Sequence, residues 1–324
     1  MWIRLVVAGL VVLALAGRAT AWNSTGHMAV ALLAWKQLDA EQRRAAHQLL
    51  KTHPHYRRYL AEARPEGVAE DEWAFLRAAT WPDWVRETPE HHASDLKPFH
   101  HAPWHYINLP FVAPADAGQF APADLTPPTP NVVTALNAAF DALLARQENA
   151  EDAAIHFCWV LHLAGDIHQP LHCASLVSHR YPPPRGDEGG NRLAITPSKR
   201  PESLHTYWDG LLGKNTHYQA IEGIVKRVDA ASEHDPELAT KLRAHTTVES
   251  WSEESFAQAV KFAYLDGQLP TVDYRQVEGG EIPHSEVPVL PADYASTARE
   301  VAQRQAALGG WRLAAMVKQI TAAK

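Results

Sequence analysis

The sequence predicts a mainly α-helical protein. Apolar residues recur at helical spacing through most of the chain, and no stretch keeps the alternation of apolar and polar residues that marks a half-buried strand. Hydrophobic residues make up 46% of the 324 residues, which is enough for a sizeable core. These observations favour a single compact, multi-helix domain with long irregular loops.

The first 21 residues have the pattern of a signal peptide. Residues 1–4 supply a positive charge, residues 5–16 are apolar but too short to span a bilayer, and residues 19–21 form a small-residue cleavage site. A signal-anchor helix is the alternative, which the short apolar core and the cleavage site disfavour. We therefore expect residues 22–324 to be the mature domain, periplasmic or secreted, without a membrane anchor.

The chain is acidic. Its formal charge of −7 becomes −9 (28 basic and 37 acidic residues) without Arg4 and Arg18 of the signal peptide. An acidic chain is poorly suited to bind nucleic acid through a basic surface. Bound divalent cations would change that balance, since each ion would add two positive charges at one place. A polyanionic partner is therefore not excluded.

Helices are expected along most of the mature chain. Residues 22–37 predict an apolar helix, residues 42–63 two short amphipathic helices, and residues 70–86 one helix that ends in Trp-Pro-Asp-Trp-Val-Arg. The Pro- and Ala-rich residues 110–130 predict an irregular surface loop. The remaining helices are expected at residues 131–147, 152–169, 203–212, 219–230, 236–244, 248–265 and 292–323.

Residues 159–172, WVLHLAGDIHQPLH, carry the most chemistry. His162 and Asp166 are four residues apart in a predicted helix, so they project from one face, one turn apart. An imidazole and a carboxylate are costly to bury unless something binds them, and a divalent metal does so directly. A hydrogen-bonded pair without a metal is the alternative. His205 and Asp209 repeat the spacing, which favours a buried metal cluster.

Two other histidines of this stretch are interpreted differently. Pro170 ends the predicted helix, so His172 is displaced from the face that bears His162 and Asp166 and is expected beside a neighbouring ion. His168 points to another side of the helix, and we do not expect it to be a ligand.

Further candidates lie upstream. Asp83 stands among tryptophans, where a carboxylate needs a partner, and Arg86 and a metal are the two candidates. His105 opens an apolar extended run, unlike the other histidines of residues 91–105. His105 is therefore the candidate ligand of that loop.

The predicted mature N-terminus adds a chelating group. Once residues 1–21 are removed, the amino nitrogen and carbonyl oxygen of Trp22 can form a five-membered chelate. His27, in the first turn of the following helix, is near enough to complete it. Taken alone, His27 would be a surface histidine at a helix start.

Cys158 and Cys173 are not expected to form a disulfide. A helix from Cys158 to residue 169 would carry the chain roughly 16 Å away, and few residues remain for its return. Cys158 lies one turn before His162, so a ligand role is open, but a small buried hydrophobe is the better interpretation.

The order of these motifs resembles a known family. Trp22 with His27, then WPDWVR, WHYIN, HLAGDIHQPLH, GGN and LHTYWD are similar to the trinuclear-zinc, single-strand-specific nucleases, the S-one/P-one nucleases. The resemblance covers residues 22–210 by motif and the later helices more loosely. It implies the fold that these nucleases share with zinc-dependent phospholipase C, and the activity of an exported zinc endonuclease.

The resemblance also implies three zinc ions, whose ligands are imidazole and carboxylate groups of the kind that zinc accepts. Two of the ions would share Asp166. The implied ligand sets are Asp83, His105, His162 and Asp166 for the first ion, the Trp22 amino nitrogen and carbonyl oxygen, His27 and Asp166 for the second, and His172, His205 and Asp209 for the third.

Within this resemblance, the ions activate water and stabilise the leaving alkoxide, so that phosphodiester cleavage leaves 5′-phosphate products. Arg86 matches the family's phosphate-facing cation and would also orient Asp83, so both are expected to act in catalysis. Tyr106 matches the base-stacking aromatic, which any unpaired base can use. Asn108 stands where better-known members have an acid, which leaves the base preference open. The choice between DNA and RNA is also open.

Two other functions fit parts of the sequence. Zinc-dependent phospholipase C shares the N-terminal Trp and a similar ligand order, but WHYIN, GDIHQPLH and Tyr106 favour a nuclease. A non-catalytic exported zinc carrier would use the 19 histidines, but it has no need of Arg86 or Tyr106. The expected partners are single-stranded nucleic acid or nucleotides, 3′-nucleotides among them, and we expect a monomer without a stable protein partner.

Overall fold

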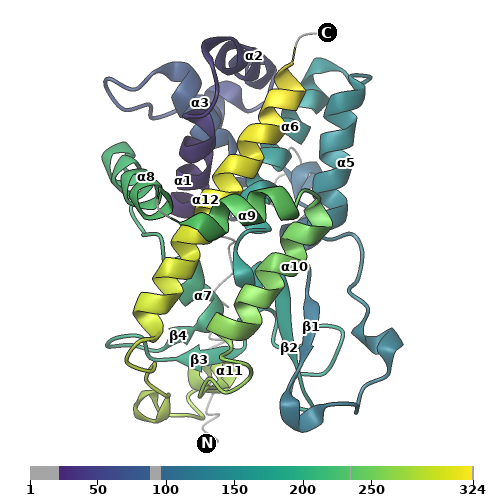
Figure 1. Ribbon diagram of the computed structural model, residues 1–324, viewed down its shortest axis with the longest axis vertical. Coiled ribbons are helices and arrows are strands. Elements are labelled where there is room, and N and C mark those ends of the chain that lie inside the picture. Colours follow the sequence, from purple (N-terminus) through teal and green to yellow (C-terminus); the bar gives the residue numbers. More distant parts are fainter. Residues whose placement is uncertain (1–21, 88–95, 234, 323–324) are drawn as a thin grey trace, which may run out of the picture.

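The structure is a computed structural model, and it describes residues 22–87, 96–233 and 235–322. Helices dominate it, as the sequence predicts (Figure 1). The longest helix, α12 (Tyr294–Thr321), runs diagonally across the view in Figure 1, and α1 (Ser24–Trp35), α6 (Ala150–Asp166) and α8 (Tyr218–Ser232) pack against it. The expected signal peptide, residues 1–21, lies outside the described residues.

Helix α1 is apolar on all sides because it is covered on all sides. Besides α12 and α8, it contacts α6 and α3 (Glu70–Ala78), and every residue from Thr25 to Trp35 is buried. Asn23 caps its N-terminus, where the side-chain oxygen accepts a hydrogen bond from the Gly26 N–H. His27, in the first turn of this helix, therefore lies in the interior and not at the surface.

The other helices surround this centre. The predicted helix at residues 131–147 is confirmed as α5 (Val132–Ala145), which starts at an Asn131–Thr134 capping box and packs along α6. Helix α2 (Ala40–Leu50) packs on α3. Further helices are α7 (Leu204–Asp209), α9 (Pro236–Ala244), α10 (Val248–Gln258) and α11 (Tyr274–Glu278). The sequence did not predict α11.

Two predicted helices end earlier than expected, each ahead of a proline. The helix expected at residues 70–86 is two helices, α3 and α4 (Trp81–Glu87), because Pro82 is tolerated only in the first turn of a helix. The helix expected to reach residue 169 ends at Asp166. Gln169 precedes a proline and has an extended backbone conformation (ψ 115°). This conformation is incompatible with an α-helix, so the helix ends before Gln169.

Short helical turns fill several segments expected to be helix or loop. The second helix expected within residues 42–63 is only a π-helical turn, and the helix expected at residues 248–265 finishes in another. These π-helical turns are Tyr56–Leu60 and Ala259–Ala263. The 3₁₀ turns are Lys97–Phe99, Ala102–His105, Pro114–Asp116, Pro122–Leu125, Pro170–His172 and His284–Glu286.

Two small sheets lie in the lower half of Figure 1, next to α7 and α11. In one, β1 (Leu109–Val112) pairs in parallel with β2 (Ala174–Val177), with Leu109 opposite Ala174. In the other, β3 (Leu193–Ile195) lies between β4 (Glu202–Ser203) and β5 (Val272–Asp273), antiparallel to both. The stretch at residues 110–130 thus contains a strand that the sequence did not predict.

Two further expectations concern covalent and membrane structure. Cys158 and Cys173 are free and buried, which confirms the prediction that they form no disulfide with each other. Within residues 22–87, 96–233 and 235–322, each helix is too short or too polar to be a candidate membrane span.

The close approach of α1 and α12 predicts opposite effects of two Gly→Ala substitutions. A Cβ on Gly310 of α12 would lie 2.5 Å from Leu33 Cβ, so Gly310→Ala should lower the free energy of unfolding by about 1–3 kcal/mol. Gly223→Ala in α8, where the nearest atom would be 3.6 Å away, should raise it by up to about 1 kcal/mol. Urea unfolding measures both, and equal effects would contradict the packing.

Candidate metal centre

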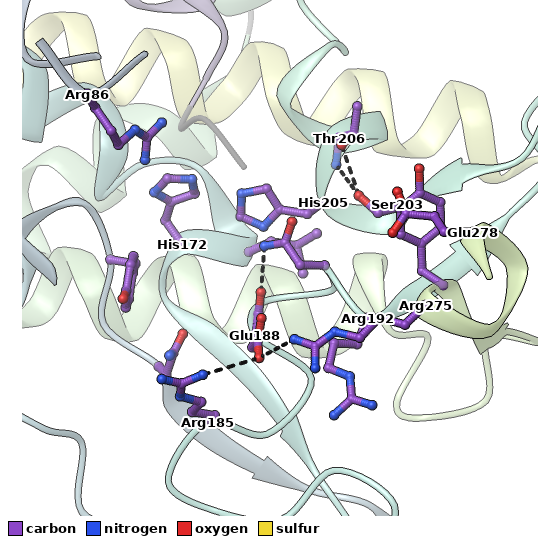
Figure 2. A pocket seen from close by; sticks show the side chains of 15 residues that line it. Arg86, His172, Arg185, Glu188, Arg192, Ser203, His205, Thr206, Arg275 and Glu278 are labelled. Atoms are coloured by element: carbon purple, nitrogen blue, oxygen red, sulfur yellow. Dashed lines mark hydrogen bonds and ion pairs between the residues drawn. The ribbon is translucent and has the colours of Figure 1, made fainter. Parts of the chain in front are cut away.

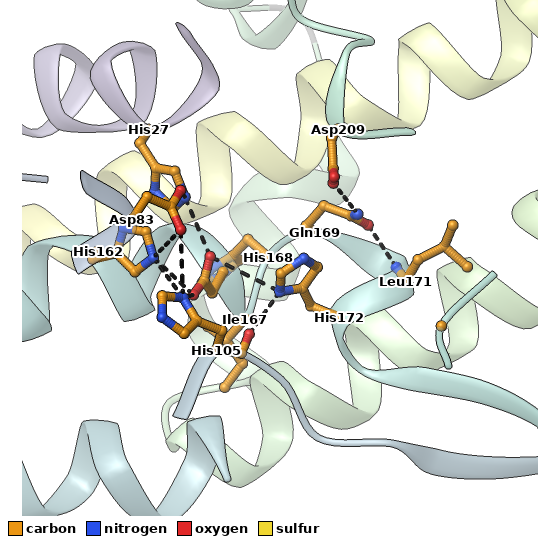
Figure 3. Close-up of polar contacts among 12 residues, drawn as sticks. His27, Asp83, His105, His162, Ile167, His168, Gln169, Leu171, His172 and Asp209 are labelled. Carbon is orange, nitrogen blue, oxygen red and sulfur yellow. Dashed lines mark hydrogen bonds and ion pairs between the residues drawn. The ribbon is translucent and has the colours of Figure 1, made fainter. Parts of the chain in front are cut away.

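Imidazoles and carboxylates from separate segments meet at the C-terminal end of α6 (Figure 3). All of them are at most 4% exposed. Their potential ligand atoms form three groups, in each of which these atoms lie within 4.8 Å of one another. The groups are His27, His162 and Asp166; Asp83, His105 and His162; and His172, His205 and Asp209.

Asp166 lies at the junction of the first two groups. One of its oxygens, Oδ2, is 3.1 Å from both His105 Nδ1 and His162 Nε2, and the other, Oδ1, is 3.2 Å from His27 Nε2. Asp83 approaches from α4, with Oδ1 3.8 Å from the same nitrogens of His105 and His162. The carboxylate that the resemblance assigned to two ions therefore stands between the two groups.

The second ring nitrogen of three histidines is used to orient the ring. Nδ1–H donates a hydrogen bond to a backbone carbonyl at 2.6–2.8 Å in each case. The pairs are His162 with Ala79, His172 with His105, and His205 with Gly189. Such bonds fix the tautomer and leave the Nε2 lone pair for a ligand.

These carbonyl acceptors depend on local backbone structure. Ala79 lies in the break between α3 and α4. Gly189 has a φ of +64°, and a Cβ there would lie 2.5 Å from the Leu171 carbonyl oxygen, so this position requires glycine. The first glycine of the GGN motif therefore lies close to the backbone of Leu171.

The strand pairing places two of the candidate ligands. The Ile107 N–H donates to the His172 carbonyl at 2.8 Å, immediately before β1 and β2 pair. His105 and His172 precede these two strands, so the parallel pairing holds both imidazoles beside Asp166, where His172 Nδ1 is 3.9 Å from Oδ1.

A residue that the sequence analysis missed orients the third group. The Gln169 side-chain amide donates to Asp209 Oδ1 at 2.7 Å, and its carbonyl oxygen accepts from the Leu171 N–H at 2.6 Å (Figure 3). The other oxygen of Asp209 is 3.5 Å from His205 Nε2. Gln169 could have been suspected only from its position between Asp166 and His172.

Burial and mutual charge set the protonation of these groups. Burial lowers the pKa of His105 to about 3 and also lowers that of His172. Burial alone would raise the pKa of Asp166, but the neighbouring imidazoles, His162 foremost, hold it well below its usual range. Burial raises the pKa of Asp209 well above its usual range. Neutral imidazoles and an ionised Asp166 are the forms that bind metals.

The donor set fits zinc. Each group combines imidazole nitrogen with carboxylate oxygen, which zinc accepts. His172 Nε2 is buried and has no hydrogen-bond partner within the part of the chain that the structure describes. A bound cation would satisfy that nitrogen and would favour the ionised form of Asp209.

Trp22 is fully buried. The next residue, Asn23, donates its N–H to the Asp209 carbonyl at 3.4 Å and its side-chain amide to the Gly213 carbonyl at 2.7 Å. The N-terminal segment is therefore tied to α7, which bears two members of the third group. The chelating role of the Trp22 amine stays a prediction.

The third group adjoins a pocket of about 390 Å³ (Figure 2). His172 and His205 line it together with the three other residues that the sequence singled out, Arg86, Tyr106 and Asn108. Arg86 Nη2 is 2.9 Å from Asp83 Oδ1, and Tyr106 is 37% exposed. The pocket therefore offers a cation and an accessible aromatic ring next to the buried centre.

His168 belongs to a different network, in agreement with the prediction that it faces another side. Its Nδ1–H donates to the Ala164 carbonyl at 2.7 Å, and its Nε2 accepts from Arg312 of α12 at 2.8 Å. Arg312 also donates to Glu254 of α10 at 2.7 Å. The C-terminal helices α10 and α12 thus carry a buried charged pair.

The same helices hold the turn between Asp166 and His172. The Ser255 hydroxyl of α10 donates to the Ile167 carbonyl at 2.6 Å, and Gln305 of α12 donates to the Ser255 oxygen at 2.9 Å. The end of α6 is therefore fixed from outside the metal centre.

The sequence is similar to a family of nucleases and to individual proteins named as nucleases. The family sequence model described as S1/P1 Nuclease matches residues 22–322. Endonuclease 3 of Arabidopsis thaliana is 24% identical over 346 aligned positions, which cover 100% of this chain and 96% of that protein. Endonuclease 4 of the same plant is 26% identical over 56% of this chain, and Nuclease S1 of Aspergillus oryzae is 24% identical over 64%. These matches span 57% and 59% of those two relatives.

The Arg312–Glu254 pair predicts a large effect of a remote substitution. Both side chains are at most 4% exposed, so Arg312→Met leaves a buried carboxylate with Lys241, 3.3 Å away, as its remaining cation. We expect the free energy of unfolding to fall by about 3 kcal/mol in urea titrations. Arg304→Met, which breaks a more exposed pair with Asp235, should cost less than about 1 kcal/mol. Equal destabilisation by the two substitutions would contradict this interpretation.

Proposed function

The chain belongs to the S1/P1 nuclease family, and on that basis we propose that it is a zinc-dependent endonuclease of single-stranded DNA and RNA that leaves 5′-phosphate products. The observation that carries this proposal is the meeting of buried imidazoles and carboxylates in three groups beside a pocket that contains Arg86 and Tyr106. The names of the relatives, two plant endonucleases and Nuclease S1, support a nuclease.

We propose three zinc sites. Asp166 would be shared by the first two ions. The proposed ligands are Asp83, His105, His162 and Asp166 for the first ion, the Trp22 amine and carbonyl, His27 and Asp166 for the second, and His172, His205 and Asp209 for the third. When bound, the ions lower the pKa of water and neutralise the charge of the phosphate. The hydrogen bonds of His162, His172 and His205 to backbone carbonyls keep their rings in the orientation that these sites require.

Arg86 has two roles in this proposal. Its guanidinium holds Asp83 at 2.9 Å, and it also lines the pocket, so it can donate to a phosphate oxygen while it orients the carboxylate. A donor fixed before the substrate arrives stabilises charge that develops in the transition state. Arg86 and Asp83 are therefore the proposed catalytic residues.

Tyr106 and Asn108 would bind the base. Tyr106 presents an exposed ring at the pocket, and an unpaired base can stack on it whatever its identity. A base inside a duplex is already stacked and paired, so stacking on Tyr106 favours single strands. Asn108 adds both hydrogen-bond donors and an acceptor.

The principal test concerns Arg86, whose proposed role is to bind the charged phosphate of the substrate. We expect Arg86→Ala to lower kcat on single-stranded DNA about 10²–10³-fold while the zinc content stays that of the wild type. Arg180→Ala, a partly exposed arginine that does not line the pocket, is the control and should keep full activity. Hydrolysis of phosphatidylcholine but not of single-stranded DNA by the wild-type protein would refute the nuclease proposal.

We also propose that the mature protein is exported and starts at Trp22. An amide nitrogen cannot replace the free amine as a ligand, so one alanine inserted before Trp22 should remove about one zinc ion per chain and most of the activity. The same alanine added after Lys324 controls for the extension. Metal analysis and a single-strand digestion assay measure the outcome, and equal zinc content and activity in the two proteins would contradict it.

A further inference from the structure

The pocket beside the metal centre contains three arginines that the proposed function does not use. We call Arg185, Arg192 and Arg275 the arginine arm. In Figure 2 they lie on the side of His172 and His205 away from Arg86. They come from the loop after β2, the residue before β3 and the first turn of α11.

The backbone that bears the arm is held in place. The Ser175 hydroxyl of β2 donates to the Arg185 carbonyl at 2.6 Å, and the Asp273 carboxylate caps α11 by accepting from the Arg275 N–H at 2.9 Å. Asp273 also accepts from the Arg192 guanidinium at 2.8 Å. The three guanidiniums are therefore carried by ordered elements, which reduces the entropic cost of binding a ligand.

Two of these guanidiniums share a single carboxylate. Glu188 Oε1 is 2.9 Å from Arg275 Nη2 and 4.0 Å from Arg185 Nη1. The side chains of Arg185 and Arg275 are 81% and 58% exposed, so solvent screens their pairing with Glu188 and the pairing contributes little to stability. A phosphate can compete with such a pair, and one carboxylate cannot neutralise two cations.

Arginines and aromatic rings together are the combination that binds a single strand. Tyr106 and Tyr274 line the same pocket as the arm. Grooves for single-stranded nucleic acid join cations that follow the backbone with rings on which bases stack. Guanidinium groups bind phosphate oxygens bidentately, and they matter here because the chain as a whole carries a formal charge of −7.

From these observations we infer that the arginine arm binds backbone phosphates of nucleotides that flank the cleaved bond. The inference rests on the proposed nuclease function and extends it. The site then recognises a strand longer than a dinucleotide, because the phosphates of the added nucleotides reach Arg185 and Arg275. Glu188 opposes this binding, since it competes for the same guanidiniums.

The test compares two substrates of different length, decathymidylate and dithymidylate. For the double variant Arg185→Ala/Arg275→Ala, KM should rise about tenfold more for the longer substrate than for the dinucleotide. The dependence of log KM on log salt for the longer substrate should weaken by about 0.7 for each phosphate that an arginine no longer neutralises. An equal change of KM for both substrates, or no change for either, would overturn the inference.

A second variant should move KM in the opposite direction. Glu188→Gln removes the competing charge and keeps the shape of the side chain, so it should lower KM for decathymidylate relative to dithymidylate. Arg180→Ala, in the same loop but outside the pocket, should leave the ratio of the two KM values unchanged. Thermal melting of each variant separates an effect on binding from an effect on folding.

The failure of the inference can be told from the failure of the proposed function. If the wild-type protein cleaves both substrates and the ratio of their KM values is the same in every variant, the arm does not bind the strand although the nuclease proposal stands. If the wild-type protein, loaded with zinc, cleaves neither substrate, both proposals are wrong.

Discussion

The fold depends on the burial of Asp166 among imidazoles. This carboxylate has no exposed surface, and it lies 3.1–3.2 Å from ring nitrogens of His27, His105 and His162. An ionised group is expensive to remove from water unless cations or hydrogen bonds replace the water. Apolar helices that carry such groups can pack only if something binds them. Folding of the helices and assembly of the centre are therefore coupled.

The regular helices and strands are interrupted near the centre, and these interruptions orient the candidate ligands. The break between α3 and α4 frees the Ala79 carbonyl for His162, and the end of α6 before Pro170 turns His172 toward a neighbouring group. The β1–β2 pairing then brings the segment of His105 alongside that of His172. Irregular backbone in this protein is where ligand side chains are oriented.

The sequence predicted the parts of the site that follow from local spacing. The pairs His162–Asp166 and His205–Asp209 lie four residues apart on single helices, so helical geometry places each pair on one face. Asp83, His105, His27 and Trp22 were joined to these pairs by resemblance to a family, because no local rule relates segments so far apart in the chain.

What the sequence did not predict depends on packing between distant segments. No periodic pattern marks Gln169, the Arg312–Glu254 pair or the arginine arm. An arginine in a helical pattern is usually exposed to solvent, so the sequence gives no reason to expect Arg312 in the interior. Arg312 of α12 lies 144 residues from His168, its hydrogen-bond partner just beyond α6. The break within residues 70–86 has another cause, because a proline is compatible with the first turn of a new helix, and Pro82 lies in the first turn of α4.

Anomalous X-ray diffraction at the zinc absorption edge, from crystals of the protein that begins at Trp22, tests the central claim most directly. The account predicts one zinc peak in each of the three groups, with Asp166 between two of the peaks. Peaks confined to surface histidines, or a centre without anomalous scattering in zinc-saturated crystals, would contradict it.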